Sequence, residues 1–557
     1  MNFLQEPPAL AENQYTDDRV LQAFLARHVP PDTLEAMRPD LERMGALAAG
    51  PLHELAVQHR NDEPKLVAWD AWGRRVDRIE VNDAWKAYQQ VAAREGLVAT
   101  GYERRHGAWS RLHQFALVYL FAPSSQTYTC PLAMTDGCAR TLEVLGPDEL
   151  RQRVFPHLVS RDPASAWTSG QWMTERTGGS DVGRSETVAR LVDGSWRLYG
   201  TKWFTSAVTS EVTLTLARPE GNGPGGKGLA LFFVELRDAA GCLRNIGVNR
   251  LKDKLGTRHL PTAELTLDGT PAEPVAGLSD GIRNMASMLN ITRTWNAVCA
   301  VAGMRRSLAL ARDFAKRRVA FGAPLAEKPL HLDTLAGLAA EYEAAFLLTF
   351  HELLLLGRAE LGLASAEEVS LLRVIQPLAK LLTAKQAVAV ASEVLECFGG
   401  AGYVEDTGLP ALLRDSQVLP IWEGTTNVLS LETLRALSRE NAWQPFAEHV
   451  RAHAAGVQSP ALAEAARTAV RAVDRALSWC AETGARDQRA LEAGARRFAI
   501  TLGRGLALAL LASQAQWSLA RGDRRSAAAT QRFLSHGVEP ALATVADLDE
   551  TTELALG

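Results

Sequence analysis

The sequence has few cysteines and no long apolar run. Its six cysteines stand at positions 130, 138, 242, 299, 397 and 480, and no two of them form a Cys-x-x-Cys pair. This scatter argues against a disulfide framework and a cysteine zinc site, and it is typical of a reducing compartment. The longest apolar runs, such as residues 353–356, are far too short to span a bilayer. The first residues lack a basic segment and an apolar core, so we expect a cytoplasmic protein without a membrane span.

The sequence also lacks a strong charge of either sign. Its 60 lysines and arginines nearly balance its 64 acidic residues, which gives a net charge of −4 at pH 7. No global field therefore draws the chain to nucleic acid or to an acidic membrane, although a local basic face is compatible with this balance. His53, Glu54 and His59 resemble a metalloprotease motif, but the histidines are six residues apart instead of four and do not share a helix face. We expect no metal site.

The length of 557 residues predicts three or four domains. Short runs rich in Val, Thr, Leu and aromatic residues, separated by Gly, Asp and Pro, predict a small antiparallel β-domain in the middle of an α+β, mainly α, chain. Helical periodicity precedes and follows it. The expected domains are an N-terminal helical domain over residues 1–167, a middle β-domain over 168–280, a helical bundle over 281–438 and a C-terminal helical extension over 439–557.

Local signals refine this outline. Ser365 and Glu368 form a capping box that opens a long helix, and Ser459 is expected to cap a helix of the extension. Residues 221–226 read GNGPGG, which matches a dinucleotide-binding pattern to the letter. That pattern should open a helix, but residues 228–236 predict a strand, so we interpret the motif as a hairpin loop.

One carboxylate is a candidate general base. Glu423 lies between Trp422 and Gly424 in the segment LPIWEGTTN, which follows a glycine-rich turn at residues 398–403. Burial beside an aromatic ring disfavours the charged form of a carboxylate and makes it a better base. By itself this signal is weak, because a glutamate after tryptophan is more often a solvated residue at a helix end.

Five motifs in one order resemble those of acyl-CoA dehydrogenases. Residues 171–182 (QWMTERTGGSDV) look like the family's flavin-binding turn, and residues 200–206 (GTKWFTS) look like its second flavin segment. RVAFG at 318–322 is similar to the R-x-x-F-G motif, FGGAGY at 398–403 to the C-terminal glycine turn, and IWEGTTN at 421–427 to the catalytic-base segment. The long N-terminal region and the C-terminal extension resemble the AidB-type branch, which is associated with the adaptive response to DNA alkylation.

The resemblance implies an acyl-CoA dehydrogenase-like fold with FAD as the cofactor. Arg318 would reach the FAD of a neighbouring subunit, so the resemblance also implies a homotetramer, a dimer of dimers with FAD at the subunit interfaces. The residues expected to bind FAD are Gln171, Met173, Thr174, Gly179, Ser180, Phe204, Thr205, Ser206, Arg318, Phe321, Gly400, Trp422, Thr425 and Asn427.

By the same resemblance, Glu423 is the catalytic base of an FAD-dependent dehydrogenase. It would abstract the α-proton of an acyl-CoA or related thioester while the β-hydride passes to the flavin. Arg293 falls near the base and is expected to bind the substrate. Trp422 stands where the family usually has Tyr, and Phe204 where it usually has Trp. These departures leave open whether the dehydrogenation is fast, slow or vestigial.

The extension contains no lysine but many arginines. Arg467, Arg471 and Arg475 repeat every four residues on one helix face, and Arg496 and Arg497 follow. Arginine suits phosphate recognition, so the alternative hypothesis is a DNA-binding flavoprotein of the alkylation response that binds double-stranded DNA through these residues. A third interpretation is that the arginines only mediate contacts in the oligomer, because a charge run is usually a solvated face.

Overall fold

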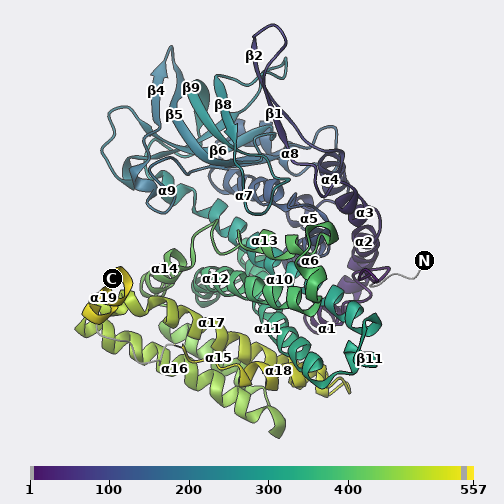
Figure 1. Cartoon of the computed structure of the whole chain (residues 1–557). Helices are drawn as coiled ribbons and strands as arrows, with labels where there is room; N and C mark the ends of the chain where they lie inside the picture. The colour runs from purple at the N-terminus through teal and green to yellow at the C-terminus, as the bar shows by residue number, and fades with distance from the viewer. Residues whose placement is uncertain (1–5, 541–547) are drawn as a thin grey trace.

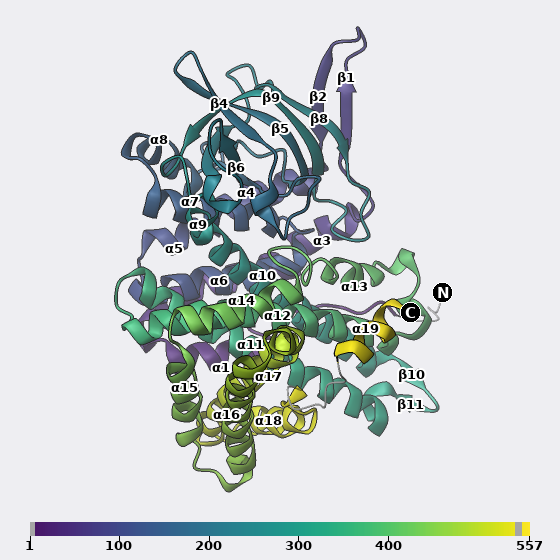
Figure 2. The same cartoon turned by 90° about the vertical axis from the view of Figure 1, so that its left-hand side faces the viewer.

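The structure, a computed structural model, describes residues 6–540 and 548–557. Figures 1 and 2 agree on the arrangement: the sheet lies at one end of the molecule, the long helices in the middle and the C-terminal helices at the other end. This arrangement confirms the predicted fold class. Short 3-10 helices connect the larger elements: Gly107–Trp109, Ala122–Ser124, Val182–Arg184, Gly226–Gly228, Leu325–Glu327, Gly399–Gly402, Glu405–Thr407 and Pro460–Leu462.

The N-terminal region packs its helices around one apolar core. Every residue of α6 is buried, polar ones included, because the helix lies between its neighbours and the central bundle. A two-stranded hairpin, β1–β2, interrupts the helices of this region, which the sequence pattern indicated to be mainly helical. The elements are α1 Arg19–His28, α2 Pro31–Ala49, α3 Pro51–Gln58, β1 Lys65–Trp69, β2 Arg75–Glu80, α4 Asp83–Arg94, α5 Ala99–Glu103, α6 Ser110–Phe121, α7 Thr129–Leu145 and α8 Asp148–Leu158.

The middle region is a seven-stranded sheet with its own apolar core, which includes Trp172 and Phe232. The strand order is β3-β6-β4-β5-β9-β7, with β8 paired to β9 and β6 also paired to β7. Most pairs are antiparallel as predicted, but β3–β6 and β4–β6 are parallel. The GNGPGG motif joins the antiparallel pair β6 and β7, so its interpretation as a hairpin loop is confirmed. The strands are β3 Ser169–Trp172, β4 Val188–Val192, β5 Ser195–Ser206, β6 Val212–Pro219, β7 Ala230–Glu235, β8 Ile246–Leu251 and β9 Thr262–Pro274.

Three helices of 32 residues each, α10, α11 and α12, form the centre of the molecule. They pack against one another and carry the N-terminal helices on one side. The predicted capping box is present, since Ser365 and Glu368 each accept a hydrogen bond from the other's backbone. The elements are α9 Gly281–Asn284, α10 Ala286–Arg317, β10 Val319–Ala320, β11 Ala323–Pro324, α11 Pro329–Glu360, α12 Ala366–Cys397, α13 Pro410–Ser416 and α14 Thr426–Arg439.

The extension packs on the free side of this bundle through α17, which contacts α11, α12 and α14. Within the described residues α17 alone has the length and apolar composition of a membrane span, but 83% of its most apolar window is buried in the protein, as in a core helix. Ser459 occupies the predicted N-cap position and Pro460 follows it at the first helical position, but the segment starts as a 3-10 turn before α16 and the Ser459 side chain makes no capping hydrogen bond. The helices are α15 Trp443–Ala455, α16 Ala463–Arg486, α17 Gln488–Leu519, α18 Arg525–Ser535 and α19 Leu548–Leu556.

A half-buried carboxylate on α11 ties the extension to the bundle. Glu341 accepts hydrogen bonds of 3.1 Å from both terminal nitrogens of Arg504 on α17, and its Oε1 lies 2.8 Å from Nδ1 of His536. Burial opposes the charged form of Glu341, but His536 and Arg504 outweigh it and lower the pKa of the carboxyl from 4.5 to about 2. The charged carboxylate therefore stabilises the folded state more than the unfolded one.

This contact predicts a pH-dependent stability. Because the folded pKa lies below the unfolded one, the contribution is complete above about pH 4.5 and is lost as the pH falls towards 2, and it amounts to about 3 kcal/mol. Glu341→Gln is expected to lower the melting temperature at neutral pH, and the difference from the unaltered protein should shrink as the pH falls below 4.5. A melting-temperature difference that is the same at pH 7 and pH 3.5 would contradict this assignment.

Candidate active site

A large cavity of about 1590 Å³ lies where the sheet meets α10, α14 and the loop between α13 and α14. It brings together segments that are far apart in the chain: Nε2 of Gln171 lies 3.4 and 3.5 Å from the carboxylate oxygens of Glu423, which is 252 residues away in sequence. The predicted site residues that line it are Gln171, Met173, Thr174, Gly179, Ser180, Phe204, Ser206, Arg293, Trp422, Glu423 and Thr425.

Five residues predicted to bind FAD do not line this cavity in the described chain. Thr205 is fully buried and donates a hydrogen bond of 2.6 Å to the carbonyl of Ala263 on the neighbouring strand. Gly400 and Asn427 are exposed beyond the cavity wall. Arg318 and Phe321 belong to the β10–β11 hairpin at the edge of the bundle (Figure 2), where the side chain of Phe321 is 98% exposed.

The backbone at Glu423 is strained. Its φ of 55° is in the left-handed region, which a residue with a β-carbon rarely occupies, and Gly424 follows with a φ of 105°. The hydroxyl of Thr425 then caps α14 by accepting the backbone N–H of Val428. Strain of this kind persists only where the surroundings fix the conformation, and it is concentrated at functional sites.

Two side chains fix this segment from neighbouring helices. Nε of Arg293 donates to the carbonyl of Glu423 at 3.2 Å, and both of its terminal nitrogens pair with Glu432, at 2.6 and 2.9 Å. Nζ of Lys380 donates to the carbonyl of Gly424 at 2.6 Å. Burial lowers the pKa of Lys380 to about 7, against the opposing charge of Glu423.

The carboxylate itself faces a hydroxyl. Oγ1 of Thr292 donates to Oε2 of Glu423 at 2.6 Å, the short distance expected for a hydroxyl bound to an ionised acceptor. Trp422 is held in place as well, because its indole N–H donates to Oδ1 of Asn296. Glu423 is therefore a half-buried carboxylate with a fixed orientation at the wall of the cavity.

Sequence reasoning missed Thr292, Asn296 and Lys380. All three lie on the long helices α10 and α12, far in sequence from the base segment. One signal was available for Lys380, because it is a lone cation within the apolar stretch 374–382 and a buried lysine needs a partner. Thr292 and Asn296 carry no comparable signal.

The two predicted flavin segments are joined to each other. Nζ of the fully buried Lys202 donates to Glu175 at 2.7 Å, and the backbone N–H of Trp203 donates to the carbonyl of Thr174 at 2.9 Å. A β-carbon at Gly179 would lie only 2.7 Å from Oγ1 of Thr174, so a larger residue here would displace the Thr174 side chain. These contacts present the backbone of the turn to the cavity as a fixed cradle.

The cavity has features that fit a bound flavin. Oε1 of Gln171 is buried and has no hydrogen-bond partner in the described part of the chain, and it stands beside the base. The apolar ring of Phe204 is 56% exposed on the cavity wall, where a second flat ring would cover it. The donor set, the glycine turn and the partly exposed ring suit a large heteroaromatic cofactor with a phosphate tail.

The arginines predicted to bind DNA do not form a free cationic face. Arg467 pairs with Glu464 at 2.8 Å, while Arg471 and Arg475 both pair with Glu539, at 3.4 and 3.1 Å. Arg467, Arg471, Arg475 and Arg496 are exposed, whereas two nitrogens of Arg497 are buried inside the extension. No comparison with known proteins supports DNA binding either, so that hypothesis is left without support.

Comparison with known proteins connects all four regions to one family. Residues 170–270 match the family model described as acyl-CoA dehydrogenase, middle domain, and residues 279–438 match its C-terminal domain. Residues 5–163 match the adaptive response protein AidB N-terminal domain, and residues 441–550 match the acyl-CoA dehydrogenase 11 C-terminal domain-like model.

Individual relatives agree with these matches. The chain is 42% identical to acyl-CoA dehydrogenase family member 11 of Caenorhabditis elegans, over 92% of this chain and 86% of the relative. It is 31% identical to the putative acyl-CoA dehydrogenase AidB of Escherichia coli K12, over 79% and 80%. The crystal structure of Caenorhabditis elegans ACDH-11 in complex with C11-CoA superimposes with a TM-score of 0.95 at 39% identity, covering 100% of this chain and 96% of that one. The chain belongs to the acyl-CoA dehydrogenase family, in the branch that carries an AidB-type N-terminal domain.

Proposed function

We propose that the protein is an FAD-dependent acyl-CoA dehydrogenase in which Glu423 is the catalytic base. The observation that carries this proposal is the position of the carboxylate. Glu423 is fixed by Thr292 on the wall of the cavity that the two flavin segments also line. A positioned base and a flavin turn on one cavity are the two parts that α,β-dehydrogenation of a thioester requires.

FAD is the cofactor of the protein, as predicted, since it is the cofactor of this family. Bound in the cavity, FAD supplies the acceptor for the β-hydride. The backbone of the Gly179–Ser180 turn offers N–H groups to a pyrophosphate, and Thr174 and Gln171 offer hydrogen-bonding groups to the ring. Phe204 provides an apolar surface against which the ring can pack.

The chain's own part of the reaction is proton transfer. Glu423 removes the α-proton of the thioester, and the electron pair of that C–H bond forms the double bond as the β-hydrogen leaves with its own pair. The acyl group is thereby oxidised by two electrons. Thr292 holds the carboxylate towards the cavity, while Arg293 and Lys380 fix its backbone, so the base does not have to be reoriented in each turnover.

An acyl-CoA substrate is supported by the shape and charge of the cavity. Arg283, Arg435 and Arg439 contribute cationic side chains to its lining, and Arg435 and Arg439 lie one turn apart on α14. Cationic side chains in the lining suit the phosphates of a coenzyme A group, and the apolar side chains of the lining suit an acyl chain. The ACDH-11 structure, which has nearly the same fold, was solved with C11-CoA.

Anaerobic titration of the purified flavoprotein with acyl-CoAs of increasing chain length tests this function. Bleaching of the visible flavin band by at least one chain length is the expected result, and the most effective length identifies the substrate class. A band that no acyl-CoA bleaches, even where it shifts on binding, would mean that the fold binds its ligands without carrying out the reaction.

The exposed tip of the β10–β11 hairpin supports the assembly of several subunits. Phe321 is 98% exposed, and Val319 on the same hairpin is 56% exposed. Apolar side chains presented this way on a projecting hairpin are typical of a surface that a partner covers. A dimer of dimers would place Arg318 and Phe321 against the cofactor site of a neighbouring subunit.

Phe321→Asp is therefore expected to weaken self-association. Loss of one buried phenyl ring costs about 1.5–3 kcal/mol, so the dissociation constant should rise at least about tenfold. Sedimentation velocity at several protein concentrations measures the change. Trp72→Asp is a matched control, because Trp72 is 94% exposed at the turn of the other hairpin, β1–β2. Equal effects of the two substitutions, or no effect of the first, would overturn the assignment of this surface.

A further inference from the structure

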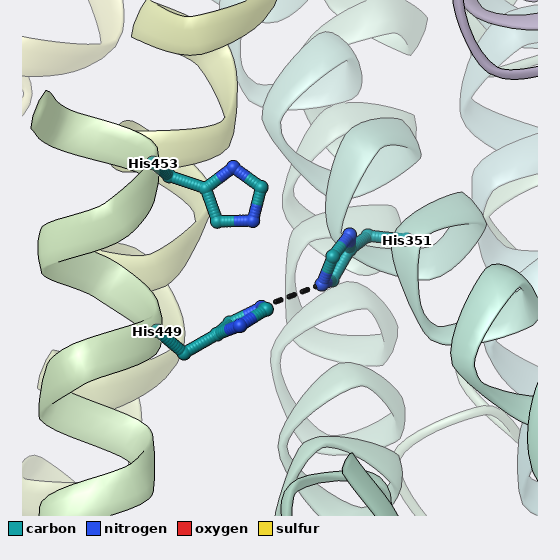
Figure 3. Close-up of side chains that lie close together, drawn as sticks. All are labelled: His351, His449 and His453. Carbon is teal, nitrogen blue, oxygen red and sulfur yellow. Dashed lines mark hydrogen bonds between the residues drawn. The ribbon is translucent and has the colours of Figure 1, made fainter. Parts of the chain in front are cut away.

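Three histidines meet between the central bundle and the extension, away from the active-site cavity. His351 projects from α11, and His449 and His453 project towards it from α15 (Figure 3). Nε2 of His351 lies 2.7 Å from Nε2 of His449, and one nitrogen from each of the three rings falls within 4.8 Å of the others. No other group of three potential metal ligands as close as this occurs in the described part of the chain.

The rings are arranged around a common centre. The ring of His453 stands edge-on to both of the others, with centroid distances of 5.1 Å to His351 and 4.8 Å to His449. Its side chain makes no hydrogen bond within residues 6–540 and 548–557, so both of its nitrogens are open to another partner. His351 is buried, and the other two rings are half-buried.

We propose that His351, His449 and His453 bind a divalent transition-metal ion of the zinc class. Histidines four residues apart share one face of a helix, which is the spacing by which helices present two imidazole ligands to one metal. The third ligand comes from the facing helix. Imidazole suits zinc, copper and nickel, and zinc commonly takes three histidines with a fourth position left for water.

The distances fit such an ion after small rotations of the rings. With zinc–nitrogen bonds of about 2.0–2.1 Å, tetrahedral geometry places ligand nitrogens about 3.4 Å apart. The observed separations lie on both sides of that value, at 2.7 Å for one pair and up to 4.8 Å for the group. Rotation of the rings about their side-chain bonds that moves the ligand nitrogens by roughly 1–2 Å would bring the three separations to this value.

The surroundings keep the rings in the form that binds metal. Burial lowers the pKa of all three histidines, that of His453 to about 3, so each ring is neutral at pH 7 and has a free lone pair. Two charged side chains act on the cluster from other elements. Glu368 of α12 raises the pKa of His449, while Arg27 of α1 lowers those of His351 and His453. His28 of α1 lies close as well and is itself neutral, since burial lowers its pKa to about 4.

The ion would link two parts of the molecule. α11 belongs to the bundle that carries the active site, and α15 is the first helix of the C-terminal extension. A metal shared between them would fix the extension to the bundle without disulfides, and its binding energy would add to the stability of the docked extension.

Metal analysis of the full flavoprotein tests the site. The protein is stripped with a chelator, loaded with excess zinc chloride, desalted and assayed for metal by mass spectrometry. About one zinc ion per chain is expected, and His449→Gln and His453→Gln should each retain less than about a tenth of it. His53→Gln is the matched control, since His53 is a half-buried helical histidine outside the cluster, and it should bind zinc like the unaltered protein.

Cobalt provides a readout that does not depend on the variants folding. Co²⁺ added to the stripped, unaltered protein should produce the intense visible absorption of a tetrahedral nitrogen site at one equivalent, and zinc should remove it. Zinc addition should also raise the melting temperature of the unaltered protein and of His53→Gln. Zinc bound equally by all variants, or a protein that takes up neither zinc nor cobalt, would overturn the proposal and leave a cluster of hydrogen-bonded histidines only.

Discussion

Replacement of Glu423 by Gln is expected to lower the rate of flavin reduction by acyl-CoA about 10²- to 10⁴-fold, while FAD remains bound. The amide has the shape of the carboxylate and can still accept the hydroxyl of Thr292, so the strained backbone at residue 423 should keep its conformation. It cannot accept a proton at neutral pH, and the chemical step therefore loses its base. Anaerobic stopped-flow absorbance at the flavin band measures the rate directly.

The control for this substitution is Glu393→Gln. Glu393 is exposed on α12 and does not line the cavity, so the same change of charge there should leave the reduction rate unaltered. The flavin content of both variants, read from the visible spectrum, separates loss of chemistry from loss of cofactor. Reduction of the Glu423→Gln variant at the rate of the unaltered protein would show that another group removes the proton.

The fold could be predicted where the signal is local. Periodicity and capping gave the long helices, including the start of α12 at its capping box, because these features are set by neighbours in the sequence. The β1–β2 hairpin was missed, since β2 reads RVDRIE and its charged residues mask the alternation of a strand. The parallel pairs of β6 with β3 and β4 were missed for another reason, because an alternating pattern shows that a strand forms without showing which strand it joins.

In the site, too, features set by neighbours in the sequence could be predicted and features set by packing could not. Glu423 and the flavin turn were proposed because each lies in a contiguous motif, and the cavity brings most of those residues together. Thr292 and Lys380 were not found, because they reach the base from two long helices whose packing the sequence does not specify. The three histidines illustrate the same limit. His351 is 98 residues from His449, so no local spacing in the sequence indicates that these rings meet.

A large loss of stability is expected from replacement of Asp136, a carboxylate buried on α7. Asp136 is fully buried and accepts hydrogen bonds at 2.7–2.8 Å from Tyr102, Arg111, Gln114 and Trp295, which belong to three different helices. Arg111 is itself buried and also pairs with Glu360 at 2.6 Å. The network therefore joins the N-terminal helices to α10 and α11 through charges that have no access to water.

Asp136→Ala is expected to destabilise the protein by about 3–5 kcal/mol, because it leaves Arg111 with half of its compensating charge and strips several buried donors of their acceptor. The shift in the urea unfolding midpoint, followed by tryptophan fluorescence, measures the loss. Trp295 is one of the reporters, since its indole N–H donates to Asp136 at 2.8 Å.

The control for Asp136→Ala is an exposed ion pair of similar geometry. Asp474 on α16 lies 2.6 Å from Arg451, but both side chains are at least 40% exposed. Water already solvates these charges, so Asp474→Ala should change the stability by less than about 1 kcal/mol. If the two substitutions cost the same, the buried network would not be what holds the N-terminal domain to the bundle, and the apolar contacts of α6 and α7 would have to supply that stability instead. A large difference would show that burial, and not the ion-pair distance, sets the strength of the contact.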